Sequence, residues 1–228
     1  MSAGGTYASP PCMAAEVDPT YFDPLGTDPE QARDVARWRR AERKRLAGLR
    51  EGLGQTGRAQ ASSFICGHLA PFLASRGVGR GTVLAGTWPI RGEPDLRPLL
   101  SDLHGAGVTI ALPVVKTRAA PLVFRRWTPG MRMVRGDWNI PVPPPEADAL
   151  VPDVTLAPCL GWDGDCYRLG WGGGYFDRSL AALAPRPLAI GIALAAARLP
   201  TIYPQPHAIP LDLIVTEDGL SCKRTAQP

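Results

Sequence analysis

The chain has 228 residues, of which 45% are apolar and 20% are charged, and its formal net charge is +4. This composition is ordinary for a folded globular domain and excludes a wholly disordered chain. The 25 glycines and 25 prolines follow no G-X-Y repeat, and no run of 18 apolar residues occurs, which excludes collagen and a membrane-spanning helix.

The N-terminal residues and the cysteines both indicate in which cellular compartment the protein is found. The first residues have neither a basic start nor an apolar core, so we predict no secretory signal and a cytoplasmic protein. The five cysteines are an odd number without any CxxC spacing, which argues against a disulfide framework and a structural zinc site. We therefore expect free thiols in a reducing compartment. The cysteines are Cys12, Cys66, Cys159, Cys166 and Cys222.

The chain is predicted to form one domain, residues 28–220, between an irregular tail at 1–27 and a short tail at 221–228. A first helix is expected to begin at the capping signal TDPE and to end near Leu53, because its apolar residues fall on one helical stripe. A second helix is expected over 57–75, where the same helical spacing continues.

The first helix carries most of the positive charge. Between Arg33 and Arg58 stand nine basic and three acidic residues, a net charge of +6 that leaves −2 for the rest of the chain. Such a helix suits nucleic acid, a phosphorylated small molecule or an anionic tail, and it is also typical of a solvated helix face. Because interleaved aromatic residues are missing apart from Trp38, an RNA-associated protein is the weakest hypothesis, and no nucleic-acid partner is expected.

The rest of the chain alternates between strands and helices. Helices are expected over 95–103 and 175–183, and residues 128–152 are rich in proline and glycine and are predicted to be mostly loop. Strands are expected over 83–90, 109–115, 122–127, 154–162, 187–194 and 211–217, the last of these being the final strand. This alternation predicts a single three-layer α/β/α domain with a largely parallel sheet. Such a sheet binds ligands beyond the carboxyl ends of its strands.

A glycine-rich loop lies between the fourth predicted strand and the helix that follows it. Four of the five residues 170–174 are glycine, which lets the backbone approach an anion and point its N–H groups at it. The following helix adds its positive N-terminal end. Arg168 and Arg178 flank the loop and are expected to bind phosphate oxygens. Asp177 is expected to bind a magnesium ion that bridges the phosphates. The loop fits neither the Walker nor the Rossmann pattern, and a tight structural turn is the plain alternative.

Residues 168–178, RLGWGGGYFDR, resemble the signature of the 5-formyltetrahydrofolate cyclo-ligases, which reads approximately R-L-G-x-G-x-G-Y-Y-D. Four further segments are similar to this family in the same order. They are PIRGEPDLRPLL at 89–100, DWNIPVP at 137–143, DVTLAPCLGWDGDCYRLG at 153–170 and IVTED at 214–218. The resemblance covers roughly residues 33–218. Because an ordered series of motifs is far more specific than one glycine loop, the chain is identified as a member of this family.

The resemblance implies an ATP-dependent ring closure. In this family the formyl oxygen of 5-formyltetrahydrofolate attacks the γ-phosphate of MgATP, N10 closes on the activated carbon and phosphate leaves, which gives 5,10-methenyltetrahydrofolate. Catalysis then rests mainly on positioning and charge neutralisation. ATP and Mg²⁺ are the implied cofactors, and the reduced folate and ATP are the implied partners. We expect a monomer without a membrane partner.

The resemblance also assigns roles to residues. Glu93 is expected to accept hydrogen bonds from the guanidine-like edge of the pterin, and Trp88 or Trp138 is placed to stack on it. The plain alternatives are a surface glutamate and core aromatic residues. The implied catalytic residues are Arg168, Tyr175 and Asp177, and the last is also the implied magnesium ligand. The implied ATP-binding residues are Arg39, Arg43, Arg168, Gly170, Trp171, Gly172, Gly173, Gly174, Tyr175 and Phe176.

One departure from the family pattern concerns the first helix. The family has a lysine and an arginine four residues apart there, and both reach ATP. In this chain Arg39 matches the arginine only if Val35 takes the place of the lysine. The alternative registers pair Arg39 with Arg43 or Arg40 with Lys44.

A second departure concerns the metal. Ala208 stands where the family has an Asp that acts as a second magnesium ligand, and losing a carboxylate leaves less charge to hold the ion. Asp212, Glu217 and Asp218 are the acids near enough in sequence to compensate. The alternative to an active cyclo-ligase is therefore a folate- or nucleotide-binding paralogue with weak or no catalysis.

Overall fold

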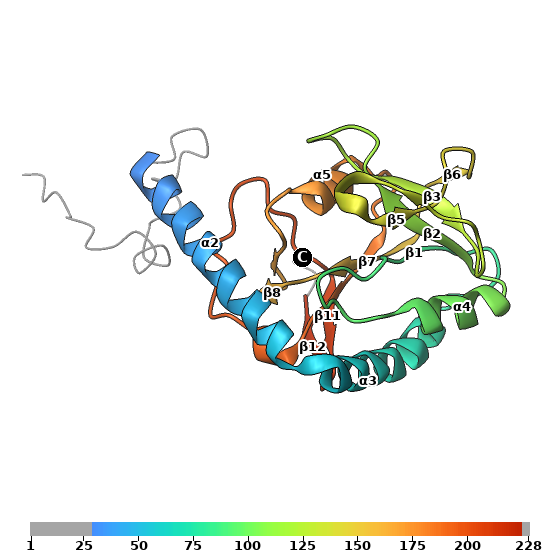
Figure 1. The fold of residues 1–228 in the computed structure, drawn as a ribbon, viewed down its shortest axis with the longest axis horizontal. Helices are drawn as coiled ribbons and strands as arrows, with labels where there is room; N and C mark the ends of the chain where they lie inside the picture. Colours follow the sequence, from blue (N-terminus) through green and yellow to red (C-terminus); the bar gives the residue numbers. More distant parts are fainter. Residues whose placement is uncertain (1–28, 225–228) are drawn as a thin grey trace, which may run out of the picture.

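The computed structural model describes residues 29–224 (Figure 1). Cys12, the tail expected at 1–27 and the first two residues of the capping signal lie outside the described residues. No helix within 29–224 combines the length and the apolar content that crossing a bilayer requires.

An eight-stranded mixed sheet forms the centre of the fold. The order across it is β12-β11-β10-β7-β1-β2-β3-β6. The pairs from β11 to β2 are parallel, whereas β12, β3 and β6 are added antiparallel at the edges. The prediction of an α/β fold with a largely parallel sheet is confirmed. The strands are β1 (Val83–Ala85), β2 (Thr109–Val114), β3 (Val123–Trp127), β6 (Ala149–Leu150), β7 (Val154–Pro158), β10 (Leu188–Ile192), β11 (Leu213–Thr216) and β12 (Gly219–Lys223).

The two faces of the sheet carry side chains of different size, because successive residues of a strand point to opposite sides. One face has large residues that pack with leucines of α3 (Gly54–Ser75) and α4 (Arg97–Gly105). The large residues include Leu84, Ile110, Leu156 and Ile190. Their neighbours on the opposite face include Ala85, Ala111, Ala157 and Ala189. These small residues face α5 (Tyr175–Ala182) and let it approach the sheet on the side opposite α3 and α4 (Figure 1).

α2 (Pro29–Gly52) is a long helix that borders one end of the sheet (Figure 1). Its buried side chains are few and its charged residues are mostly exposed or half-buried. Leu46 is its main apolar anchor, with 1% of its surface exposed. A Cβ on Gly161 would lie 2.6 Å from Leu46 Cδ1, so the helix touches the backbone of the segment that leads into the glycine loop. The position of α2 therefore depends on this contact.

We expect Leu46→Ala to lower the free energy of unfolding by about 2–5 kcal/mol, the usual cost of removing a fully buried leucine side chain. Urea denaturation followed by circular dichroism measures this loss. The matched control is Leu53→Ala, because Leu53 is 40% exposed and such surface positions change stability by about 0.5 kcal/mol or less. Equal losses in the two variants would contradict the packing described for α2.

Two predicted strands are shorter than expected. The strand at 83–90 ends at Ala85, because the residues that follow include two prolines and two glycines, which favour a loop over a strand ladder. The strand at 154–162 is divided after β7. Its last part, β8 (Gly161–Trp162), leaves the sheet and pairs antiparallel with β9 (Arg168–Leu169). This hairpin leads directly into the glycine loop.

The C-terminal and central segments also differ from the prediction. The strand at 211–217 is not the final one, because β12 follows it and pairs antiparallel with β11. The segment 128–152 is mostly loop, as expected, but it contains short elements that the sequence pattern did not indicate. They are β4 (Val134–Arg135), a 3₁₀ turn (Asp137–Asn139), β5 (Pro141–Val142) and β6. β4 and β5 pair with each other.

The prediction of free thiols throughout is wrong for two cysteines. Cys166 and Cys222 form a disulfide, with their Cα atoms 6.0 Å apart. Cys166 lies in the β8–β9 turn with a left-handed backbone (φ 62°), and β12 carries Cys222 to it. The two are separated by 56 positions, so local spacing such as CxxC carries no information about their pairing. Cys66 and Cys159 are free.

Candidate active site

A cavity of about 500 Å³ lies beyond the carboxyl ends of the central parallel strands, where this class of sheet binds ligands. Four parts of the chain form most of its walls: α2, the β1 loop (residues 86–96), the segment 137–142 and the glycine loop (residues 170–174) with the residues on either side of it. The ends of β2 and β7, Leu122 and residues 207–208 complete the lining. All residues to which the family resemblance assigns a catalytic, ATP-binding or substrate-binding role line this one cavity. They are Arg39, Arg43, Trp88, Glu93, Trp138, Arg168, Gly170, Trp171, Gly172, Gly173, Gly174, Tyr175, Phe176 and Asp177.

The glycine loop needs glycine for its backbone shape. Gly172 and Gly174 have φ values of 102° and 63°, which side chains other than glycine rarely adopt. A Cβ on Gly172 would also lie 3.3 Å from the guanidinium carbon of Arg43. Gly174 precedes the first residue of α5, so the positive end of that helix points into the loop. This arrangement of backbone N–H groups, a helix N-terminus and cations is suited to an anion.

Arg168 and Asp177 form a nearly buried ion pair beside the loop. Arg168 Nη2 donates to Asp177 Oδ2 at 2.7 Å, and the side chains are 5% and 18% exposed. The other carboxylate oxygen accepts the backbone N–H of Ile209 at 3.3 Å, and the Arg168 guanidinium lies 5.1 Å from the ring centre of Phe176. Arg168 Nε has no hydrogen-bond partner within residues 29–224. The ion pair thus fixes both side chains and leaves Arg168 Nε as a buried donor without an acceptor in the described residues.

Two arginines of α2 are held against the cavity by backbone carbonyls. Arg43 Nε donates to Gly170 O at 2.8 Å. Arg39 donates to Ile202 O at 3.0 Å and to Tyr203 O at 3.1 Å. Burial, and then the positive charge of Arg43, lower the pKa of Arg39 from its usual value. Two cations held so close together favour an anionic ligand between them.

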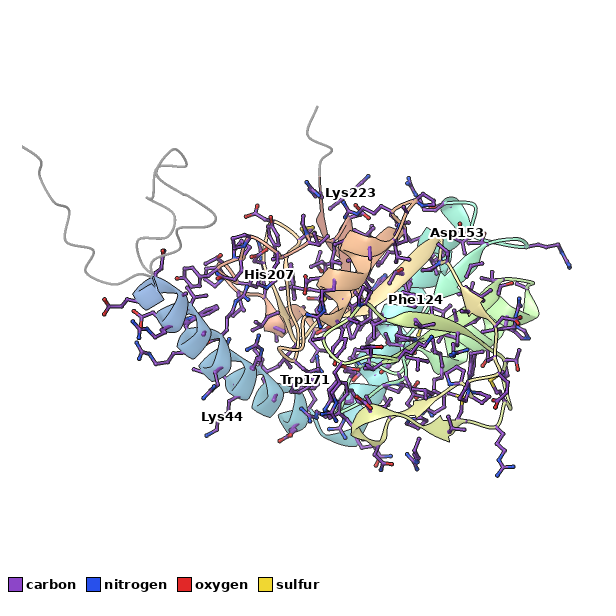
Figure 2. All side chains as sticks on the ribbon, turned by 90° about the horizontal axis from the view of Figure 1, so that it is seen from above. Lys44, Phe124, Asp153, Trp171, His207 and Lys223 are labelled. Atoms are coloured by element: carbon purple, nitrogen blue, oxygen red, sulfur yellow. A yellow bond between two sulfur atoms is a disulfide. The ribbon has the colours of Figure 1, made fainter. Side chains whose placement is uncertain are left out.

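The structure separates the alternative registers of the first helix. Arg40 and Lys44 are exposed and do not line the cavity, whereas Arg39 and Arg43 do. Lys44 projects from the outer side of α2 (Figure 2). Val35 is buried and does not line the cavity. The pair of cations that reaches the cavity is therefore Arg39 and Arg43.

Asp163 holds the backbone segment whose carbonyls bind Arg39, although the sequence analysis did not assign it a role. It is 2% exposed, and its Oδ2 accepts the N–H of Ile202 at 2.9 Å. Its Oδ1 accepts the N–H groups of Asp165 and Tyr167. Burial raises the pKa of Asp163. Asp163 thus orients the backbone that binds Arg39. The signal in the sequence is the DGD turn, where an Asp side chain bonds the backbone two residues on.

Glu93 lies at the junction of the β1 loop and the glycine loop. It is 8% exposed. Its Oε1 accepts Trp171 Nε1 at 3.1 Å and its Oε2 accepts the N–H of Ile90 at 3.2 Å. Arg91 lies over the Trp171 ring, 4.7 Å from its centre. Burial is the main reason that the pKa of Glu93 is raised above its ordinary value. Glu93 is therefore a buried acceptor in the cavity wall and not a surface glutamate.

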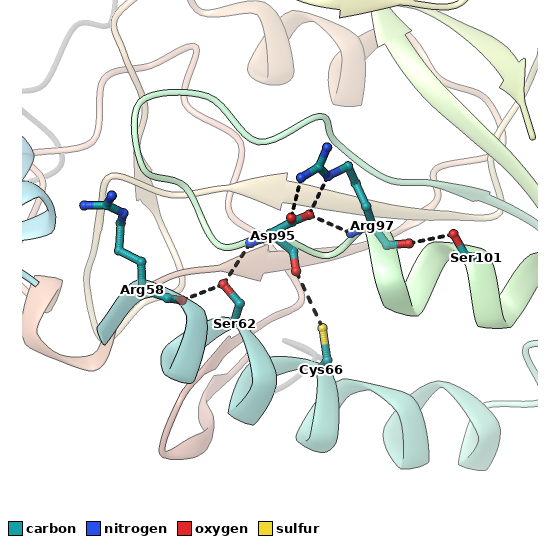
Figure 3. A network of polar contacts seen from close by, with 6 residues as sticks. All are labelled: Arg58, Ser62, Cys66, Asp95, Arg97 and Ser101. Atoms are coloured by element: carbon teal, nitrogen blue, oxygen red, sulfur yellow. Dashed lines mark hydrogen bonds and ion pairs between the residues drawn. The ribbon is translucent and has the colours of Figure 1, made fainter. Parts of the chain in front are cut away.

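The β1 loop is anchored to α3 by a small network (Figure 3). Ser62 Oγ accepts the N–H of Asp95 at 2.9 Å and donates to Arg58 O at 2.7 Å. Asp95 also forms an ion pair with Arg97 at 2.6 Å, and the Arg97 guanidinium lies over the ring of Trp88. Because both ends of the loop are held, Glu93 and Trp88 have a fixed place in the cavity wall.

Two aromatic residues, Trp138 and Tyr175, line another part of the cavity wall. Trp138 is 62% exposed and has a left-handed backbone, φ 53°. Its ring meets that of Tyr175 edge to face, with centres 5.6 Å apart. An exposed aromatic ring held in an unusual backbone conformation is not explained by core packing. Trp138 is thus available to stack on a ligand.

Several residues that the sequence offers for anion or metal binding lie elsewhere. Arg178 donates to Gly173 O at 2.6 Å and is not among the lining residues. Asp212 accepts the N–H of Ala189 and pairs with Arg186. Glu217 accepts the N–H of Ala195. Asp218 does not line the cavity either. None of these three acids therefore lines the cavity beside Ala208, and no group of three metal-ligating side chains occurs in the part of the chain that the structure describes.

Comparisons with known proteins agree with the resemblance read from the sequence. The model of the 5-formyltetrahydrofolate cyclo-ligase family matches residues 35–217. A 5-formyltetrahydrofolate cyclo-ligase of Mycolicibacterium smegmatis is 31% identical over 136 residues, which are 56% of this chain and 70% of the relative. One of Escherichia coli is 34% identical over 94 residues, 39% of this chain and 52% of the relative.

Two solved structures have the same fold. The NMR structure of Aquifex aeolicus 5,10-methenyltetrahydrofolate synthetase superposes with a TM-score of 0.69 and 25% identity, and the match covers 83% of this chain and 94% of that one. The 5,10-methenyltetrahydrofolate synthetase of Mycoplasma pneumoniae gives a TM-score of 0.64 at 23% identity, covering 78% and 98% of the two chains. The likeness thus extends over nearly the whole of both solved proteins.

Proposed function

The chain belongs to the 5-formyltetrahydrofolate cyclo-ligase family, whose members are ligases, and from this we propose that it closes 5-formyltetrahydrofolate to 5,10-methenyltetrahydrofolate in an ATP-dependent reaction. The observation that carries the proposal is the joining of two different subsites in one cavity. Arginines and a glycine loop suited to phosphates adjoin a buried carboxylate suited to a pterin. Trp171 belongs to the glycine loop and donates to that carboxylate.

The nucleotide end of the cavity is proposed to bind the triphosphate. Arg43 uses only Nε within the described part of the chain, so its two terminal nitrogens are free to bind phosphate oxygens. Arg39 retains Nη1. Arg168 is fixed by Asp177 next to the glycine loop. Together with the N-terminus of α5, these groups stabilise the charge that develops on the transferred phosphoryl group.

Magnesium fits this site only in a restricted way. Asp177 is the carboxylate beside the glycine loop, and each of its oxygens already accepts one hydrogen bond, which leaves a lone pair on each for a cation. Mg²⁺ is usually held by one or two carboxylates together with substrate phosphates and water, so one carboxylate suffices. We propose Asp177 as the protein ligand of an ion that neutralises phosphate charge when bound.

The folate end is proposed to bind the pterin. Glu93 offers its carboxylate to the amino and ring N–H groups of the pterin, and Trp138 or Trp88 stacks on the ring. Tyr175, which adjoins both Trp138 and the glycine loop, stands where the two subsites meet. The groups that bind the two substrates thus converge on the residues around Tyr175.

The proposed reaction depends on how the protein positions the two substrates, and no protein side chain forms a covalent bond with either of them. The formyl oxygen attacks the γ-phosphorus and ADP leaves, so the oxygen becomes part of a phosphate leaving group. N10 then adds to the formyl carbon, loses its proton, and the C–O bond breaks to release phosphate. The cavity holds the formyl oxygen and the γ-phosphate together, which removes most of the entropic barrier to the first step.

The first experiment follows the absorbance of methenyltetrahydrofolate after the full chain is mixed with 5-formyltetrahydrofolate, with and without MgATP. We expect a rise that requires both ATP and Mg²⁺. The second candidate function, a binding paralogue with little catalysis, rests on Ala208. No rise, combined with measurable binding of folate or ATP, would favour that paralogue over the enzyme. The monomeric state and the cytoplasmic location stay predictions.

A further inference from the structure

Arg50, in the last turn of α2, is a deeply buried cation without a full set of partners. Its side chain is 1% exposed. Nη2 donates to Cys159 O at 2.8 Å, whereas Nε and Nη1 have no hydrogen-bond partner anywhere in residues 29–224. An apolar side chain of similar length would fill the same space without the cost of desolvating a charge. The fold therefore carries a buried charge that packing alone does not explain.

The stem of Arg50 lies directly beneath the β1 loop. A Cβ on Gly92 would lie 3.4 Å from Arg50 Cγ and 3.5 Å from its Cδ, so the loop passes over the side chain at the residue just before Glu93. Gly92 has a left-handed backbone, φ 73°, which suits glycine and lets the loop approach this closely. Arg58 of α3 packs beside the same glycine, with its Cδ 3.1 Å from the position of that Cβ.

Few charged groups surround the Glu93 carboxylate. From its own loop, the N–H of Ile90 donates to it and Arg91, which is exposed, adds a positive charge. From the glycine loop, Trp171 donates to it. From α2, Arg50 supplies the buried positive charge. The positive charges of Arg50 and Arg168 both act on the thiol of Cys159, but burial raises its pKa to about 12, so it is uncharged at neutral pH.

We propose that Arg50 is a positioning residue for substrate binding: its buried positive charge compensates the buried carboxylate of Glu93, so that Glu93 meets the substrate charged and in a fixed orientation. The identity of that substrate as a reduced folate rests on the proposed function. Arg91 cannot replace Arg50 in this role, because an exposed charge is screened by water and salt, whereas a charge within the protein acts through a medium of lower dielectric constant.

The first test measures the ionisation of Glu93 directly, without any substrate. Because Trp171 Nε1–H donates to Glu93, its indole resonance in a ¹H–¹⁵N NMR spectrum shifts when the carboxyl is protonated. The chain has six tryptophans, and the resonance that disappears in Trp171→Phe identifies the right one. We expect Arg50→Gln, which removes the charge and keeps a donor for Cys159, to raise the titration midpoint by about one pH unit, a tenfold change.

Two control variants isolate the charge of Arg50. Arg50→Lys keeps the charge and is expected to keep the midpoint near that of the unsubstituted chain. Arg58→Gln removes a cation that packs on the same glycine and leaves the Arg58 carbonyl in place for Ser62 (Figure 3), so the midpoint should not move. If Arg50→Gln does not fold, Arg50→Met gives the same comparison. An unchanged midpoint in a folded Arg50 variant overturns the proposal.

The second test measures how the charge of Arg50 affects substrate binding. We expect Arg50→Gln to raise KM for the folate about tenfold with little change in kcat, and to have no further effect in a chain that already carries Glu93→Gln. Equal effects in both backgrounds would show that Arg50 acts through the fold and not through Glu93. If the unsubstituted chain has no turnover, the proposed function fails, but the indole titration still decides whether Arg50 governs Glu93.

Discussion

Asp177→Asn is expected to lower turnover by about 10²–10³-fold, the effect of removing one group that stabilises the charge of a transition state. The amide has the shape of the carboxylate but no charge. It therefore neither attracts Mg²⁺ nor holds Arg168 as an ion pair beside the phosphoryl group. The rate of methenyltetrahydrofolate formation at saturating ATP measures the loss. We expect the variant to bind folate normally, because Glu93 and Trp138 are unchanged.

Asparagine is the better replacement at this position because alanine would disturb the fold. Arg168 has a side chain that is 5% exposed, and removing its partner altogether leaves a buried charge, at a cost of about 3–5 kcal/mol. The matched control is Asp212→Asn. Asp212 also accepts a backbone N–H and pairs with an arginine, but outside the cavity. Normal turnover in Asp177→Asn would show that Asp177 is not the metal ligand.

Glu93→Gln is expected to raise KM for the folate by about 10–100-fold, since hydrogen bonds to a charged group contribute roughly 1.5–3 kcal/mol. The effect on kcat should be smaller, because Glu93 binds the pterin and is not part of the phosphoryl transfer. Steady-state kinetics with varied folate at saturating ATP separates the two constants. Glu146→Gln, the same change at an exposed residue, should leave both constants unchanged.

The same residue predicts how folate binding depends on pH. Burial raises the pKa of Glu93 above the ordinary value of 4.5. As pH falls through this raised pKa, the carboxylate is protonated, loses its charge and gains an O–H donor in place of one acceptor site, so KM should begin to rise at a pH where an exposed glutamate is still charged. Glu93→Gln should abolish this rise. A KM that stays constant in the unsubstituted chain down to the ordinary pKa of glutamate would contradict the assignment.

The parts of the site that depend on local sequence could be predicted. The glycine loop is a continuous motif between a strand and a helix, and the helical spacing of α2 placed Arg39 and Arg43 on one helix. The register between them could not be chosen, because both Arg40 and Lys44 satisfy the same spacing. The choice depends on contacts with distant segments, such as the packing of Leu46 against Gly161 and the bond from Arg43 to Gly170 O.

The parts that depend on distant residues could not be predicted. The spacing of charges on α2 gives no sign that Arg50 turns inward beneath Gly92. The pairing of Cys166 with Cys222 requires β12, and the prediction assigned the part of it that carries Cys222 to the tail at 221–228. Asp212 and Glu217, two of the acids offered in place of the one missing at Ala208, accept backbone N–H groups instead, and those bonds form only when distant segments lie side by side.

The hydrogen bonds from α2 to residues far along the chain have a consequence for folding. Arg39 donates to carbonyls 163 and 164 positions further along, and Arg43 to one 127 positions further along. A chain synthesised from its N-terminus therefore exposes its basic helix on the ribosome long before the acceptors exist. Contacts of such large sequence separation form slowly. The cavity is thus completed only after residues 202–208 have emerged, and until then the nascent chain offers these arginines to any anionic surface nearby.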